Sequence, residues 1–185
     1  METRSSKGST TASGAEESPR LSAEVLENLW NGVEATIEGS FLFRSLDEAA
    51  RRELVERGVV MVCTAGREIL AEGELGDDFY LIDHGVVEVT TSVSGSPVSL
   101  GTLQRGGFFG EVAMLTGRAR TATVRALTDV TLVRFDKADI DEVLDRAPAA
   151  RRLLEAMIAG RAKSAAEKIT RHLSTMPPSG GTPVE

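Results

Sequence analysis

Two charged residues nine positions apart, Glu111 and Arg120, lie in a segment whose composition suits a small-molecule site. Gly110 precedes a stretch, residues 111–115, with the residue types for one or two helical turns. A short helix entered through glycine presents free backbone N–H groups, which bind anions. The planar guanidinium of Arg120 can bind a phosphate through two parallel hydrogen bonds. The Glu111 carboxylate repels phosphate, but it can accept hydrogen bonds from sugar hydroxyls while it pairs with an arginine. The spacing therefore predicts a pocket for a sugar phosphate.

Structural alternatives exist for these residues. Arg120 and Glu111 could form a surface ion pair that contributes little. The wider pattern around them favours a binding site instead. For Thr121, a strand-edge position and a ligand contact remain equally open. Four nearby residues are predicted to be core or strand residues whatever the ligand does: Phe79, Tyr80, Val87 and Val89.

Length and composition limit the class of protein. The 185 residues fit one domain with helical extensions, and 41% hydrophobic residues suffice for a core. With 21 Lys and Arg against 28 Asp and Glu, the formal net charge of −7 disfavours nucleic acid as a general partner. The lone Cys63, with only His84 and His172, argues against a disulfide or a metal centre. No apolar stretch approaches a membrane span or a secretory signal, so the expected compartment is the cytoplasm.

The chain divides into helical ends and a glycine-rich middle. Helical periodicity predicts one helix within residues 21–40 and a second over residues 46–57. Ser45 and Glu48 have the spacing of a capping box for the second helix, and Gly58 stands at its C-cap.

Residues 59–135 change to short β-forming runs separated by glycine. This spacing favours an antiparallel roll or barrel over a sheet with helical crossovers. Seven strands are predicted, near Val59–Thr64, Glu68–Ala71, Phe79–Asp83, Val86–Thr91, Val98–Leu103, Thr123–Ala126 and Val130–Phe135.

Helical pattern returns at Asp136, which can cap a helix to about Arg146, and a longer helix follows Pro148. The seven Lys and Arg of residues 146–171 are interpreted as a solvent-exposed face. This interpretation is preferred to a binding surface for an acidic or nucleic-acid partner. An apolar stripe on the last helix permits homodimerisation without requiring it: Leu154, Ile158, Ala165, Ile169 and Leu173.

The predicted organisation is a tail (1–20), N-terminal helices (21–58), a β-roll (59–135), C-terminal hinge and lid helices (136–173) and a second tail (174–185).

Residues 109–124 resemble the phosphate-binding cassette of cyclic nucleotide-binding domains. That family includes protein kinase A regulatory subunits, catabolite activator proteins and cyclic-nucleotide-gated channels. The likeness covers F-G-E-V-A-M-L from Phe109 and R-T-A-T-V from Arg120, except for Thr121. The chain departs at Ala119, where the family often has proline, and this loop is therefore expected to be less rigid. A second block, residues 73–89, resembles a hairpin of the same family.

The resemblance implies a mainly β fold, an eight-stranded antiparallel β-roll with an N-terminal helical bundle and C-terminal hinge and lid helices. It implies that Arg120 holds a cyclic phosphate and Glu111 the ribose 2′-hydroxyl, and that Gly110 and Ala113 contribute backbone groups. Thr121 does not decide the base. The complete implied binding set is Phe109, Gly110, Glu111, Val112, Ala113, Arg120, Thr121 and Ala122. Three residues of the last helix are equally placed to cover the base, and packing on the roll or at a dimer seam is the equally open alternative for them: Met157, Ile158 and Arg161.

The expected function is a cyclic nucleotide sensor, for cAMP or cGMP, that acts through its C-terminal helices on a partner in trans. That partner is an unidentified protein or a second copy of the chain, and neither a membrane nor DNA is expected. No catalytic group, cofactor or metal is expected either. The alternatives are an interaction scaffold of the same fold without a ligand, and a truncated regulator of the catabolite-activator type.

Overall fold

The structure is a computed structural model that describes residues 32–175. Residues 32–39 are helical. The helices that follow are η1 (Phe43–Ser45), α2 (Glu48–Arg57), α3 (Glu111–Thr116), α4 (Lys137–Arg146) and α5 (Pro148–Thr175). The strands are β1 (Val59–Cys63), β2 (Glu68–Leu70), β3 (Phe79–His84), β4 (Val86–Val93), β5 (Ser96–Gln104), β6 (Phe108–Phe109), β7 (Thr123–Ala126) and β8 (Val130–Phe135). The predicted tail 1–20, the start of the first predicted helix and residues 176–185 lie outside this range.

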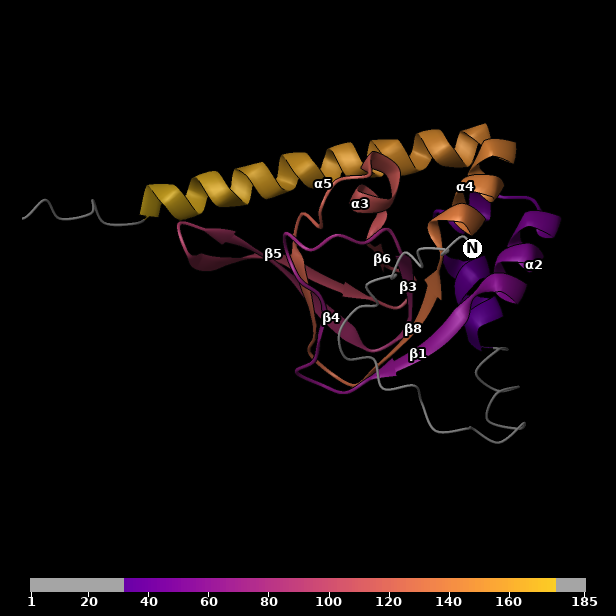
Figure 1. The fold of residues 1–185 in the computed structure, drawn as a ribbon, viewed down its shortest axis with the longest axis horizontal. Coiled ribbons are helices and arrows are strands. Elements are labelled where there is room, and N and C mark those ends of the chain that lie inside the picture. The colour runs from indigo at the N-terminus through magenta and orange to yellow at the C-terminus, as the bar shows by residue number, and fades with distance from the viewer. Residues whose placement is uncertain (1–31, 176–185) are drawn as a thin grey trace, which may run out of the picture.

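The strands form two four-stranded antiparallel sheets, ordered β1-β8-β3-β6 and β2-β7-β4-β5. This arrangement confirms the eight-stranded roll (Figure 1). The strand that the periodicity missed is β6, because its two residues, Phe108 and Phe109, are too few to show a period. They pair with Leu81 and Tyr80 of β3, so the chain enters the cassette from an anchored strand.

Strand β3 is buried on both faces, which explains its nearly continuous apolar sequence. Phe79 and Leu81 pack against the helices, and Tyr80 and Ile82 pack between the two sheets. The Phe79 ring stacks on Phe108 with centroids 5.4 Å apart, a pair worth about 0.5–1.5 kcal/mol beyond its burial. Both cores therefore meet at β3 and hold the first residues of the cassette.

The start of α2 differs from the prediction. The N-cap is Asp47, whose carboxylate accepts a hydrogen bond from the Ala50 backbone N–H at 2.8 Å. Ser45 instead donates its hydroxyl to the Leu42 carbonyl, so the predicted Ser45–Glu48 capping box is wrong. A carboxylate at the N-cap is preferred because it meets both the free N–H groups and the helix dipole.

The C-cap predicted at Gly58 is confirmed. Glycine is required there because a side chain has no room, and not because of the backbone conformation. Its φ of −67° is open to any residue. A Cβ there would lie 2.6 Å from a methyl carbon of Val133 and 3.0 Å from the Phe135 ring. Glycine therefore lets α2 approach β8 closely.

The hairpin of β4 and β5 is longer than predicted. It extends to Val93 and resumes at Ser96, so that only Ser94 and Gly95 form the turn. Both turn residues have positive φ, 51° and 81°, as a tight two-residue hairpin requires.

The C-terminal helices cover one side of the roll. The predicted cap of α4 at Asp136 is confirmed, although its side chain makes no capping hydrogen bond. In Figure 1, α5 passes over α3 and continues along β5. Its Lys168 donates to the Leu100 carbonyl of β5. Within residues 32–175, no helix combines the length and the hydropathy needed to cross a membrane.

Candidate functional site

Gly110, the second residue of the cassette (residues 109–124), joins β6 to α3. Its φ is +89°, in the left-handed region that favours glycine. A Cβ at this position would lie 2.5 Å from the Asp78 carbonyl oxygen and 3.1 Å from Nη1 of Arg120. The close approach of three chain segments therefore requires a residue without a side chain here.

Arg120 is buried, with 5% of its surface exposed. Its Nη1 donates to the carbonyl oxygens of Asp78 and Gly110, at 3.0 and 3.1 Å. Its backbone is fixed as well, because its N–H donates to Glu74 and its carbonyl accepts from Gly73. No carboxylate of the described residues lies within ion-pair distance of the guanidinium, and its Nε and Nη2 make no hydrogen bond to these residues. A buried cation held by neutral groups has donors left for an anion.

The Asp78 carboxyl lies near two guanidinium groups, those of Arg134 and Arg120. Burial raises the pKa of Asp78, and the nearby Arg134 and Arg120 guanidinium groups oppose that rise. Asp78 thus contributes its backbone carbonyl directly and its side-chain charge only at longer range.

Glu111 is also buried, with 4% of its surface exposed, at the first turn of α3. Its Oε1 accepts a hydrogen bond of 2.6 Å from Nη1 of Arg161 on α5. Arg161 also donates to the Phe108 carbonyl at 2.9 Å, and its guanidinium lies 4.5 Å from the centroid of the Phe108 ring. Within the described part of the chain, no donor reaches the second carboxylate oxygen of Glu111. One oxygen is therefore paired, and the other remains an acceptor.

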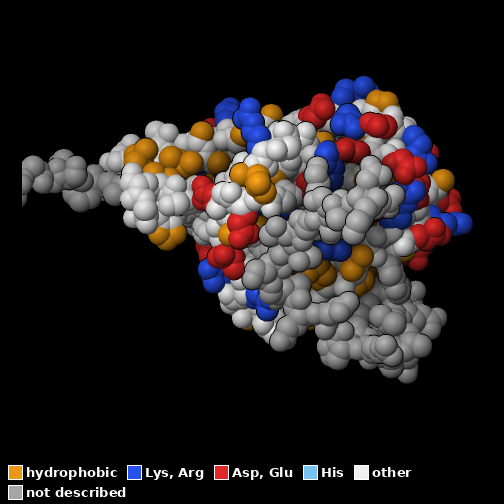
Figure 2. Space-filling view, viewed as in Figure 1, with side chains coloured by type: hydrophobic (Ala, Val, Ile, Leu, Met, Phe, Trp, Pro, Cys, Tyr) orange, Lys and Arg blue, Asp and Glu red, His pale blue; other side chains and the backbone are white. Residues whose placement is uncertain are grey.

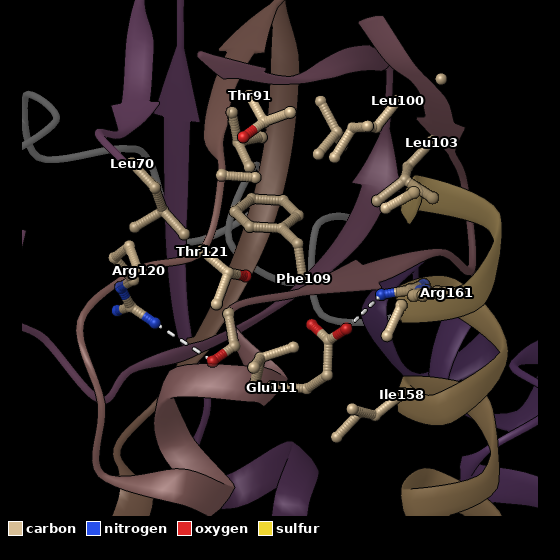
Figure 3. Close-up of a pocket in the computed structure, with 18 of the residues that line it drawn as sticks. Leu70, Thr91, Leu100, Leu103, Phe109, Glu111, Arg120, Thr121, Ile158 and Arg161 are labelled. Carbon is tan, nitrogen blue, oxygen red and sulfur yellow. Dashed lines mark hydrogen bonds and ion pairs between the residues drawn. The ribbon is translucent and has the colours of Figure 1, made fainter. Parts of the chain in front are cut away.

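These groups surround a cavity of about 330 Å³, within the usual size of small-molecule sites (Figure 3). The cassette forms its polar end. The opposite walls come from the sheet, with Leu70, Val89, Leu100 and Leu103, and from α5, with Ile158, Arg161, Ala162, Ala165 and Ile169. The cavity therefore brings together a buried guanidinium with unused donors, a carboxylate with one unpaired oxygen and an apolar slot.

All eight predicted site residues line this one cavity, from Phe109 to Ala122. Their roles toward a ligand stay predictions. Among the three candidates for a covering residue, Ile158 and Arg161 line the cavity, whereas Met157 packs against the helical core. The apolar stripe of the last helix was the signal for this wall, because Ile158, Ala165 and Ile169 belong to it. The contributions of Leu100 and Leu103 had no comparable signal.

Tyr80 supports the floor beneath the cassette. Its ring stacks on Phe109, with centroids 5.0 Å apart and planes within 8°. Burial raises the pKa of Tyr80 to about 12, and the Asp78 charge acts in the same direction.

The raised pKa of Tyr80 predicts a loss of stability in strong base. The unfolded chain releases the phenolic proton near pH 10, so below that pH the stability is unaffected. Between pH 10 and about 12 the unfolding free energy should fall by about 1.4 kcal/mol per pH unit. Since the chain has one tyrosine, its ultraviolet titration reports this residue alone. Tyrosinate formation near pH 10 in a folded chain would contradict the buried position, and Tyr80→Phe should remove the effect.

The fold is a β-roll whose cavity is lined by a buried guanidinium, a buried carboxylate and an apolar slot. The chain belongs to the cyclic nucleotide-binding domain family, whose sequence model matches residues 39–147. It is 34% identical to the cAMP-dependent protein kinase regulatory subunit of Schizosaccharomyces pombe over 114 residues, 62% of this chain and 27% of that protein. It is 33% identical to the Yarrowia lipolytica regulatory subunit over 127 residues, 69% and 32% of the two chains. The chain thus spans about a third or less of these relatives' length.

Solved structures share the fold. The catabolite activator protein of Thermus thermophilus has a TM-score of 0.61 and 26% identity, covering 70% of this chain and 61% of that one. The regulatory domain of Toxoplasma gondii PKA, crystallised with cAMP, has a TM-score of 0.64 and 24% identity, covering 69% and 49%. The comparison with the Toxoplasma gondii domain supports a shared fold only. Both agree with the antiparallel roll and its C-terminal helix.

Proposed function

We propose that this chain is a cyclic nucleotide receptor that binds cAMP or cGMP in the cavity between the cassette and α5, and that it transmits occupancy to a protein partner. The observation that carries the proposal is Arg120, a buried guanidinium without an ion-pair partner among the described residues, at the cavity wall. A cyclic phosphate supplies the missing negative charge and accepts from Nε and Nη2 together.

Glu111 suits the ribose of such a ligand. A carboxylate that shares one oxygen with Arg161 still accepts a hydroxyl proton at the other. The pairing also fixes the orientation of the Glu111 carboxylate inside the buried site. Phosphate and ribose are thereby recognised at neighbouring points of one short segment, residues 110–120.

The base would occupy the apolar slot between the sheet and α5. Its helical wall is lined by small side chains, Ala162 and Ala165, which leave room for a ring system. The facing sheet residues Val89, Leu100 and Leu103 offer apolar contact without hydrogen-bonding groups. Thr121 lines the cavity too, but its hydroxyl does not separate adenine from guanine. We therefore propose both cyclic nucleotides as candidates.

Transmission would run through α5. Its first turns are fixed in the core by Ala150 and Leu154, whereas its second half touches the roll through Arg161 and Lys168. A ligand that alters the surroundings of Glu111 changes how the second half of α5 docks on the roll. The population shift between the two docking arrangements is limited by the difference in the ligand's affinity for them. The curated relatives are regulatory subunits of a kinase, which makes a kinase the first partner to test, and the cytoplasm remains the predicted compartment.

The proposal is tested by calorimetric titration of the chain with cAMP, cGMP and adenosine. At least one cyclic nucleotide should bind with a stoichiometry of one ligand per chain. Adenosine lacks the phosphate and should bind roughly 100-fold more weakly, because two charge-assisted hydrogen bonds are lost. Equal affinity for adenosine, or no binding heat with millimolar cyclic nucleotide, would overturn the proposal.

A further inference from the structure

The C-terminal end of α3 is held by a side chain from another element. Helix α3 ends at Thr116, and Gly117 follows in the left-handed conformation with φ of 66°. The Met114 carbonyl, in this last turn, accepts a hydrogen bond of 2.7 Å from Nζ of Lys137. A cation at this end of a helix satisfies an orphan carbonyl and complements the helix dipole. The cassette helix is thus fastened to the first residue of α4.

From Lys137 a chain of charged groups continues to α5. Lys137 pairs with Asp141 at 2.7 Å, and the other oxygen of Asp141 lies 3.8 Å from Arg151, in the first turns of α5. Arg151 also pairs with Asp145 at 2.7 Å. The side chains of Lys137, Asp141 and Arg151 are about one-third exposed, so solvent screens these contacts less than fully exposed ones. One polar path therefore links α3 to the consecutive helices α4 and α5, from which it is separated in sequence by strands β7 and β8.

Helix α4 is in turn braced against α2. Arg57 at the end of α2 pairs with Asp139 at 3.0 Å and with Glu142 at 2.7 Å. Arg146 reaches back from α4 to Glu53. In Figure 2, red and blue side chains alternate over the end of the molecule where α2, α4 and the start of α5 meet. The two helices α2 and α4 thus form a fixed support, and the Lys137 contact sets where α3 lies relative to it.

We propose that Lys137 is a positioning residue that couples the cassette helix to the start of α5, separately from the contact of Arg161 with Glu111. The proposal rests on the proposed function, because it concerns what happens when the cavity is filled. Helix α3 has two polar links to α5. Glu111 joins it to Arg161 in the middle of α5, and Met114 joins it through Lys137 and Asp141 to Arg151. A ligand that orders α3 therefore acts on α5 at two points.

The test compares Lys137→Met, which keeps the aliphatic stem and removes the donor, with Lys137→Arg, which keeps a donor. Lys163→Met is the matched control, because Lys163 is exposed on α5 and makes no contact to another described side chain in the hydrogen-bond or ion-pair range. Cyclic nucleotide affinity is measured by calorimetry. Hydrogen exchange is measured with and without ligand, separately for residues 148–156 and 161–175.

In the unaltered chain, ligand should slow exchange in α3 and in both parts of α5. Lys137→Met should weaken binding about threefold to tenfold, because the ligand must then order α3 itself. It should abolish the ligand-dependent change in residues 148–156 and leave that in residues 161–175, which depends on Arg161. Lys137→Arg should restore the coupling at residues 148–156.

Two results would overturn the coupling. One is a ligand-dependent change in residues 148–156 that persists in full in Lys137→Met. The other is an equal loss of that change in Lys163→Met. If the unaltered chain still binds ligand, either result would show that Lys137 does not couple α3 to α5. The proposed function would then still hold. An unaltered chain that binds no cyclic nucleotide removes the proposed function, and the coupling with it.

Discussion

Replacing Arg120 with alanine is expected to weaken cAMP and cGMP binding by roughly 100-fold or more. Each charge-assisted hydrogen bond contributes about 1.5–3 kcal/mol, and a bidentate phosphate contact contains two. The substitution also removes the hydrogen bonds to Asp78 and Gly110, so the unfolding free energy should fall by about 1–3 kcal/mol. Calorimetry measures the first effect and urea denaturation the second.

Two further variants test this assignment, one as a control and one that separates the charge of the guanidinium from its planar geometry. Arg118→Ala removes an exposed arginine from the same loop and should leave affinity unchanged. Arg120→Lys keeps the charge but loses the planar fork, so its affinity should lie between those of the unaltered chain and the alanine variant. A folded Arg120→Ala chain with full affinity would show that the phosphate site is assigned to the wrong residue.

Arg161→Met should disturb both the pocket and the lid helix. It leaves the Glu111 carboxylate buried without its cation, and such broken pairs are costly even when the intact pair contributes little. We expect cyclic nucleotide affinity to fall about tenfold, because Glu111 is no longer held toward the ribose. The distal part of α5, residues 161–175, should exchange its amide hydrogens faster because one of its contacts to the roll is gone.

A double variant tests whether the effect passes through Glu111. Adding Glu111→Gln to Arg161→Met removes the uncompensated charge, so part of the lost stability should return, while affinity should stay low. Lys163→Met, on the same helix, should change neither quantity. If Arg161→Met binds as tightly as the unaltered chain, the pairing has no part in ligand recognition.

The local part of the site could be predicted from the sequence, because its determinants are neighbours in the chain. Gly110, Glu111 and Arg120 lie within one short segment whose backbone is set by glycine and by the following strand. The strands of the roll were predicted for the same reason, since alternation and glycine spacing are local signals. The two-residue strand Phe108–Phe109 carries too little pattern to be found this way.

The long-range part could not be predicted. Nothing near Lys137 in the sequence indicates that its amine reaches the Met114 carbonyl, and nothing near Arg161 favours it over Met157 as the residue facing Glu111. These contacts depend on how α4 and α5 pack on the roll. The capping error at α2 has a different cause: two residues could serve as N-cap, and Asp47 lies one position from the helix whereas Ser45 lies three.

The most direct test of the account is the side-chain Nε–H signal of Arg120, observed by NMR in the nitrogen-15-labelled chain and assigned by its absence in Arg120→Lys. Addition of cAMP or cGMP should shift this signal, and the shift should saturate at one ligand per chain, because the ligand's phosphate becomes its acceptor. A saturated complex in which the Arg120 signal stays where it was would contradict the phosphate contact on which the receptor function depends.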